Sequence, residues 1–229
     1  MHGMGFGLGA AGEYDAPMWS VAEIADAVEA GLVGEAERLD AEHAVSGLDA
    51  LEEVDVHPLL AAAFTQAGYG VHREQRYPAH RKRSKRSEGE RCDFVLTPNG
   101  RALASPDQAP TLFDPPDAVA LEDAFWLEVK VVAQYTREGP NHNYTSQFLA
   151  PAQKDIRKLF KDPHTHHGGL LIVLFSQDER VAEHDLAAWL SRGLAHDLPV
   201  ESPSLREFAI TDRLGNALCA LALYPIAHA

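Results

Sequence analysis

The stretch that decides the fold is Phe125-Trp126-Leu127-Glu128-Val129-Lys130-Val131-Val132. Its aromatic and β-branched residues predict a β-strand with apolar side chains on both faces, as in a sheet that is covered on both sides. Because side chains alternate between the two faces of a strand, Glu128 and Lys130 project from the same face. A carboxylate and an ammonium group therefore point together into one space.

Outward from this strand, the sequence predicts four helices and five more strands. The helices are expected at about 20–32, 46–68, 148–160 and 181–195, and the strands at about 71–78, 91–97, 169–175, 206–212 and 217–225. Pro58 is expected to break or restart the second helix, because proline suits the first helical turn and not the interior. By the same rule, Pro151 is expected in the first turn of the third helix.

The order of these elements predicts an α/β fold with a single mixed β-sheet flanked by helices. The chain has 229 residues, of which 45% are hydrophobic and 24% are charged, and this composition is typical of a globular domain. We expect residues 1–18 to form a flexible, Gly-rich leader and residues 19–229 to form a single α/β domain. Its core is expected at about 55–175, followed by a C-terminal helix and β-hairpin at 180–226. A Pro-rich surface insertion is expected at 101–119.

Apolar runs, the N-terminal segment and the cysteines exclude several classes of protein. The longest apolar run, 170–175, is far shorter than the roughly 20 residues of a membrane span, so we expect no membrane partner. The first residues have no Lys or Arg before a hydrophobic stretch, which is unlike a secretory signal. Cys92 and Cys219 are too few and too far apart for a disulfide framework or a four-ligand zinc site. We therefore expect buried, reduced thiols in a cytoplasmic protein.

A net charge of −14 argues against a nucleic-acid partner, but the charge is unevenly distributed. Between Arg73 and Arg91, eight Lys or Arg residues stand against three Glu. The acidic remainder does not cancel this local field, because charges are screened beyond a Debye length of about 8 Å. The segment predicts either a solvated surface loop or a phosphate-contacting loop whose cations are Arg81, Lys82, Arg83, Lys85 and Arg86.

A second carboxylate is expected near Glu128. Asp93 lies in the strand predicted at 91–97, between Cys92 and Phe94, where a carboxylate is costly unless it is paired or bound to a metal. If this strand neighbours the strand of Glu128, the two carboxylates can converge at the strand spacing of about 5 Å. Two hard oxygen ligands suit Mg²⁺ or Mn²⁺, and Lys130 beside such a metal would orient or deprotonate the attacking water. The alternative is a plain ion pair between Glu128 and Lys130 on an exposed strand face.

Asp93, a spacer and Glu128-x-Lys130 on an apolar strand resemble the PD-(D/E)XK nuclease superfamily, which has a restriction-endonuclease-like fold. The resemblance covers about Asp55 to Phe175 and includes the order of helices and strands, although Asp93 follows Cys92 rather than Pro. It implies that Asp93 and Glu128 bind Mg²⁺ or Mn²⁺ and that Lys130 lies at the attacking water. It also implies a further acidic ligand from the preceding helix.

Two helices supply the remaining residues that the resemblance implies. The helix acid is Asp55, Glu52 or neither, because the best-placed turn holds His57-Pro58. The helix after the central strand has a basic ridge at positions i, i+4 and i+7, and Asp155 within it is expected either to pair with Lys158 or to face the helix dipole. Its candidates for nucleic-acid binding are Gln153, Lys154 and Lys158.

The resemblance implies a Mg²⁺-dependent nuclease that hydrolyses phosphodiester bonds in DNA. It leaves open RNA as a substrate, endonuclease or exonuclease action, and a homodimer, since double-strand cutters of this kind often act as dimers. The alternative function is a catalytically inactive nucleic-acid-binding or scaffold protein with the same fold.

Overall fold

A computed structural model of the chain describes residues 19–80, 90–104 and 117–227. The predicted leader at 1–18, the cations of the basic loop and most of the predicted Pro-rich insertion lie outside these residues. Among the described helices, none combines the length and the apolar character needed to cross a membrane.

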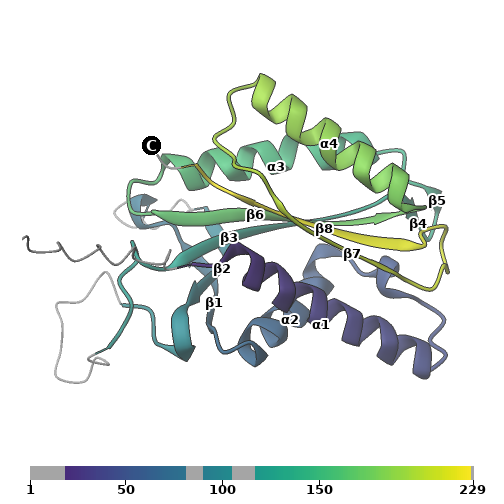
Figure 1. Cartoon of the computed structure of the whole chain (residues 1–229), viewed down its shortest axis with the longest axis horizontal. Helices are drawn as coiled ribbons and strands as arrows, with labels where there is room; N and C mark the ends of the chain where they lie inside the picture. The colour runs from purple at the N-terminus through teal and green to yellow at the C-terminus, as the bar shows by residue number, and fades with distance from the viewer. Residues whose placement is uncertain (1–18, 81–89, 105–116, 228–229) are drawn as a thin grey trace, which may run out of the picture.

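A six-stranded mixed sheet forms the centre of the described structure, with the strand order β1-β2-β3-β6-β8-β7 (Figure 1). The strands are β1 (Gly70–Arg76), β2 (Arg91–Thr97), β3 (Phe125–Ala133), β6 (His167–Ser176), β7 (Ser204–Ala209) and β8 (Leu218–Pro225). Only β3 and β6 pair in parallel, and the other neighbours are antiparallel. The short strands β4 (Tyr135–Thr136) and β5 (Gly139–Pro140) form a separate hairpin. The predicted α/β class with one mixed sheet flanked by helices is confirmed.

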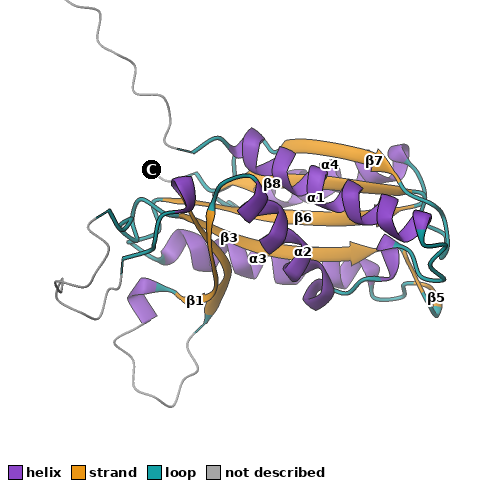
Figure 2. Ribbon diagram, turned by 90° about the horizontal axis from the view of Figure 1, so that it is seen from below, coloured by secondary structure: helices purple, strands orange, loops and turns teal. Residues whose placement is uncertain are grey.

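Helices cover both faces of the sheet (Figures 1 and 2). They are α1 (Val21–Ala41), α2 (Glu53–Gln66), α3 (Tyr144–Lys161) and α4 (Glu179–Ala195). One apolar core lies between the sheet and α1 and α2, and a second lies between the sheet and α3 and α4. Strand β3 contributes to both cores, because Leu127 and Val129 face the first and Trp126 and Val132 face the second. This two-sided burial is what the apolar sequence of the strand predicted. Both cysteines are free and buried, as expected.

Helix α1 begins where the sequence predicted and ends later. The side chain of Ser20 accepts a hydrogen bond from the backbone N–H of Glu23, which caps the helix. The sequence suggested an end near Gly31, but the helix continues to Ala41. Gly31 marks a close helix crossing instead, since a Cβ atom there would lie 2.5 Å from the Cβ of Ala63 on α2.

Two prolines lie inside helices, contrary to the expectation that each would stand at or near a helix start. Helix α2 runs from Glu53 through Pro58, and α3 begins seven residues before Pro151. A proline lacks the N–H that would bond the carbonyl four residues earlier, here the carbonyls of Val54 and Gln147. Both of those residues are exposed, so water can satisfy the carbonyls that the prolines leave unbonded.

Candidate metal centre

The sheet opens between β2 and β3 at the predicted site. The two strands pair only from Phe94 to Leu96, whereas β3 pairs with β6 along its whole length. Directly beyond this short pairing, the Asp93 side chain accepts a hydrogen bond from the backbone N–H of Val129, at 2.8 Å. A side chain thus takes the place of the neighbouring strand. Asp93 and Glu128 therefore lie on adjacent strands, at the point where the strands separate.

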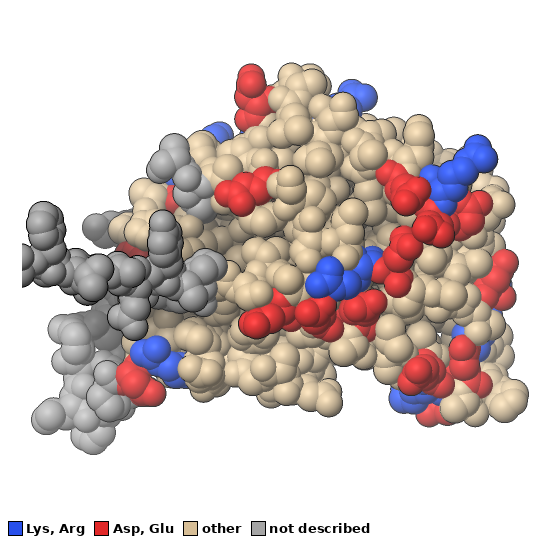
Figure 3. Space-filling model, in the orientation of Figure 1, with Lys and Arg blue, Asp and Glu red and all other residues tan. Residues whose placement is uncertain are grey.

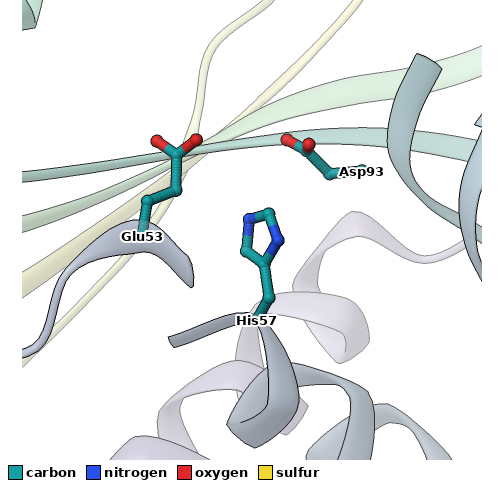
Figure 4. Close-up of side chains that lie close together, drawn as sticks. All are labelled: Glu53, His57 and Asp93. Atoms are coloured by element: carbon teal, nitrogen blue, oxygen red, sulfur yellow. The ribbon is translucent and has the colours of Figure 1, made fainter. Parts of the chain in front are cut away.

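Three potential metal ligands meet at this opening: Glu53, His57 and Asp93. One ligand atom from each lies within 4.8 Å of the other two, and Figure 4 shows the three side chains turned toward one another. Glu53 and His57 are four residues apart in α2, so they share one face of that helix. The buried Nε2 atom of His57 has no hydrogen-bond partner in the described part of the chain. A buried polar atom without a partner is unusual, and a metal ion would satisfy it.

Lys130 connects α2 and α3 across this opening. Its Nζ lies 3.1 Å from Oε1 of Glu53 and 3.2 Å from Oδ2 of Asp155. Burial alone would lower the pKa of Lys130, but the negative charges of Asp155, Glu53 and Asp93 outweigh burial and raise the pKa. Lys130 is therefore a cation near neutral pH, suited to stabilising negative charge rather than to accepting a proton.

Glu128 lies on the α3 side of the opening and is only 2% exposed. Its Oε1 accepts a hydrogen bond from the hydroxyl of Tyr77 at 2.5 Å and lies 3.8 Å from Nζ of Lys158. Burial raises the pKa of Glu128 well above its usual value, and the like charges of Asp93 and Asp155 add to this effect. The structure thus brings Glu128 within electrostatic reach of Asp93, although Glu128 is not one of the three residues grouped above.

An exposed ion pair between Glu128 and Lys130 is not what the structure shows. Glu128 is buried, and the ammonium group of Lys130 contacts Glu53 and Asp155. Asp155 also lies 2.5 Å from Nζ of Lys158, which confirms the predicted pairing. These contacts make Asp155 a buried bridge between two lysines, a role that the sequence did not indicate.

The site has more negative than positive charge. Its carboxylates are Glu53, Asp93, Glu128 and Asp155, and its ammonium groups are Lys130 and Lys158. When all are ionised, two negative charges remain uncompensated, which is the charge that one divalent cation neutralises. Carboxylate oxygens suit Mg²⁺ and Mn²⁺, whereas an imidazole nitrogen suits transition metals. The donor set therefore fits Mn²⁺ at least as well as Mg²⁺.

The helix acid predicted from the sequence, Asp55, lies outside this group. Its Oδ2 accepts a hydrogen bond from the backbone N–H of Glu52 at 3.3 Å, and the two residues form a capping box at the start of α2. Glu53 stands at the opening instead. The signal that sequence reasoning missed is the spacing of Glu53 and His57, which places a carboxylate and an imidazole one helical turn apart.

The predicted nucleic-acid contacts are only partly described by the structure. Lys154 is exposed and pairs with Glu90 at 3.5 Å, Gln153 is half-buried, and Lys158 belongs to the charge cluster above. The five cations of the basic loop, which are Arg81, Lys82, Arg83, Lys85 and Arg86, lie outside the described residues. On the face seen in Figure 3, acidic side chains outnumber basic ones and most basic side chains have acidic neighbours. That face offers a nucleic acid little unpaired positive charge.

Comparison with known proteins adds no family to this description. No family model matches the sequence, and neither a curated protein nor a solved structure matches the chain significantly.

Proposed function

We propose that the protein is a divalent-metal-dependent nuclease that hydrolyses phosphodiester bonds in DNA. The observation that carries the proposal is the convergence of Glu53, His57 and Asp93 beside Lys130 and Glu128, where β2 and β3 separate. The same arrangement supports the resemblance to the PD-(D/E)XK superfamily and a restriction-endonuclease-like core. In this proposal the Glu53 carboxylate and the His57 imidazole of α2 join the metal ligands that the sequence motif supplies.

Glu53, His57 and Asp93 would hold the metal, with Glu128 as a further acidic ligand. A divalent ion held by these residues would supply Lewis-acid chemistry to a phosphate oxygen and would lower the pKa of water. The hydrogen bond from the backbone of Val129 fixes the Asp93 carboxylate, so that little reorganisation is needed on binding. The buried position of the His57 ring, packed edge-on against Phe94, likewise restricts its orientation.

Lys130 would act on the phosphate and on the water. Its ammonium group, fixed between Glu53 and Asp155, donates hydrogen bonds to the attacking water or to a phosphate oxygen on which negative charge develops. Because nearby carboxylates raise its pKa, Lys130 stabilises charge and positions the water as a cation. Of the two roles for Lys130 that the sequence left open, the proposal adopts orientation of the water.

DNA as the substrate is part of the proposal and rests on the basic face of α3 and on the predicted loop at 81–86. Cations near the metal centre attract phosphates whatever the base sequence, since phosphate contacts position a nucleic acid and do not read it. A cytoplasmic location also stays part of the proposal, because free, buried Cys92 and Cys219 suit a reducing compartment. A homodimer is a further part of the proposal, and a measurement of the mass of the protein in solution tests it.

Cleavage of DNA in Mn²⁺, Mg²⁺ and Ca²⁺ tests the proposal. Linear duplex, single-stranded and closed circular DNA are incubated with wild type and with Asp93→Asn and Glu53→Gln, which remove a carboxylate from the site. We expect cleavage in Mn²⁺ or Mg²⁺ and a loss of at least about a hundredfold in each variant, since even indirect partners of a metal contribute ten- to a hundredfold.

The matched control is Asp55→Asn, which makes the same chemical change two residues from Glu53 but outside the group. It should lose about 1 kcal/mol of stability at most, through the weakened cap, and should retain its activity. If wild type cuts none of the DNA forms in Mn²⁺, the alternative of an inactive nucleic-acid-binding or scaffold protein takes the place of the proposal. If Asp55→Asn is as inactive as Asp93→Asn, the metal ligands are assigned incorrectly.

A further inference from the structure

A pocket of about 300 Å³ lies beside the candidate metal centre. It is bounded by α3 on one side and by the segment around Tyr77 and Ala79, together with Glu90, on the other. Two contacts join these sides: the carboxylate of Asp162 accepts a hydrogen bond from the backbone N–H of Ala79 at 2.8 Å, and Lys154 pairs with Glu90. These two contacts hold the two walls of the pocket together.

Four cationic side chains of α3 line this pocket: Lys154, Arg157, Lys158 and Lys161. Two of them are already engaged, because Lys154 pairs with Glu90 and Lys158 pairs with Asp155. Among the described residues, Arg157 and Lys161 have no carboxylate within ion-pair distance. They are four residues apart and share one face of the helix. Two adjacent cations without an anionic partner among the described residues favour an anion as the ligand of this pocket.

The carboxylate of Asp162 does not cancel this charge by pairing with a lining cation. Its two oxygens accept hydrogen bonds from the backbone N–H groups of Ala79 and His164, at 2.8 and 3.0 Å. Asp162 is also buried, with 5% of its surface exposed. Its hydrogen bonds fix the wall of the pocket, which the cations of α3 also line.

Charge and size indicate the chemical class of the anion. A phosphate monoester carries about −1.5 to −2 at neutral pH, whereas each phosphodiester within a strand carries a single negative charge. Two cations that have no carboxylate partner among the described residues match the monoester better, and the planar fork of an arginine binds two of its oxygens at once. A volume of about 300 Å³ is at the lower end for small-ligand pockets, which suits one nucleotide rather than a duplex.

The position of the pocket connects this anion with the metal centre. Tyr77 and Lys158 line the pocket, and both contact the carboxylate of Glu128. A nucleotide in the pocket therefore has its linkage to the next nucleotide close to Glu128. We propose that this pocket binds the terminal nucleotide of a DNA strand through its phosphate monoester, so that the nuclease works from phosphorylated strand ends. This inference rests on the proposed function and specifies its substrate.

The test compares the binding of oligonucleotides that differ only in their ends. Single-stranded and duplex oligonucleotides with a phosphate or a hydroxyl at the 5′ end, and separately at the 3′ end, are titrated in Ca²⁺ with wild type and with Arg157→Gln/Lys161→Gln. We expect one phosphorylated end to raise the affinity of wild type by about tenfold or more, as hydrogen bonds between charged groups do. The double variant should lose this preference, so that its affinity falls more for phosphorylated ends than for hydroxyl ends.

Arg180→Gln/Arg192→Gln is the matched control, because it removes two exposed cations from α4, outside the pocket. It changes the net charge by the same amount and should keep the preference for the phosphorylated end. Equal affinity of wild type for phosphate and hydroxyl ends would overturn the inference, as would a preference that survives in the Arg157/Lys161 variant.

Cleavage of closed circular DNA separates this inference from the proposed function. If wild type cuts closed circles in Mn²⁺ as fast as linear DNA and has no preference for phosphorylated ends, the nuclease proposal stands and the end-binding inference fails. If nothing is cut but the preference is present and depends on Arg157 and Lys161, the pocket binds terminal phosphates and the proposal of catalysis fails.

Discussion

Replacing Glu128 by Gln should stabilise the metal-free protein while abolishing its activity. The substitution removes one negative charge and nearly conserves the shape of the side chain. Burial, together with the charges of Asp93 and Asp155, raises the pKa of Glu128, whereas Lys158 and the hydroxyl of Tyr77 favour its ionised form. Since the raising causes dominate, ionised Glu128 destabilises the folded protein at neutral pH.

The structure sets the size of this effect. The ammonium group of Lys158, which attracts Glu128, is itself paired with Asp155, which repels it, so these two interactions largely cancel. Two contributions remain. Desolvation of the Glu128 carboxylate, which is 2% exposed, costs several kcal/mol in wild type and is absent in the variant. The variant loses about 1 kcal/mol because the hydroxyl of Tyr77 bonds a neutral amide more weakly than a carboxylate. The variant should gain about 2 kcal/mol, or a Tm higher by about 4–8 °C for a domain of this size.

The raised pKa of Glu128 determines how the stability difference between the variant and wild type changes with pH. The unfolded chain releases the proton of Glu128 near pH 4.3, and the folded protein holds it to a higher pH because the pKa of the buried group is raised. The contribution of this group to wild-type stability is therefore complete below about pH 4 and is lost as pH rises through the raised pKa. The advantage of Glu128→Gln should be close to zero at pH 4 and should grow with increasing pH.

Urea unfolding in EDTA between pH 4 and pH 9 measures this difference. Glu201→Gln, at an exposed position, is the control and should match wild type at every pH. Adding Mn²⁺ should reverse the order, because wild type gains more from the metal than the variant does. If metal-free Glu128→Gln is less stable than wild type by 1 kcal/mol or more throughout, Glu128 is a stabilising ion partner of Lys158 and the reasoning is wrong.

Three further predictions concern the metal, Asp155 and the basic loop. Mn²⁺ at a hundred times its Kd should stabilise wild type by about 2.7 kcal/mol and raise its Tm by about 5–11 °C, and Glu53→Gln should lose most of that shift in a thermal melt. Asp155→Ala should lower the free energy of unfolding by about 3 kcal/mol in urea titrations, because Lys130 and Lys158 both lose a buried partner. The control is Lys154→Ala, which removes an exposed ion pair and should lower the free energy of unfolding by less than about 1 kcal/mol. Alanine at the five cations of 81–86 should reduce the slope of log affinity against log salt by about 0.9 for each lost phosphate contact, and an unchanged slope would show a solvated loop.

The bounds of β2 and β3 could be predicted more accurately than the ends of α1 and α2, because the signals of these two strands are local. The bounds predicted for β2, and those for β3 to within one residue, follow from β-branched and aromatic residues bounded by turn residues. The ends of α1 and α2 depend on tertiary contacts instead. Gly31 resembled a helix end but serves the crossing with Ala63, and that contact joins residues far apart in the sequence.

The α2 residues at the site could not be identified in the same way. Which residues near the start of a helix share its sheet-facing side depends on whether the helix includes them and continues without a break, and Pro58 suggested a break that does not occur. Once α2 starts at Glu53 and continues through Pro58, Asp55 is used by the capping box. Glu53 and His57 then stand together on the face that meets Asp93.

Strand parity correctly placed Glu128 and Lys130 on one side of β3, yet their partners come from both faces of the sheet. Lys130 contacts Glu53, on the helix of one core, and Asp155, on the helix of the other. Such a contact is feasible only because β2 separates from β3 at Asp93, which leaves the side of β3 open to both layers. At the opening, the Asp93 side chain takes the place of a strand neighbour at the N–H of Val129. The same carboxylate lies where the strand pairing ends and belongs to the proposed metal ligands, so we expect metal binding and the local sheet structure to be coupled at Asp93.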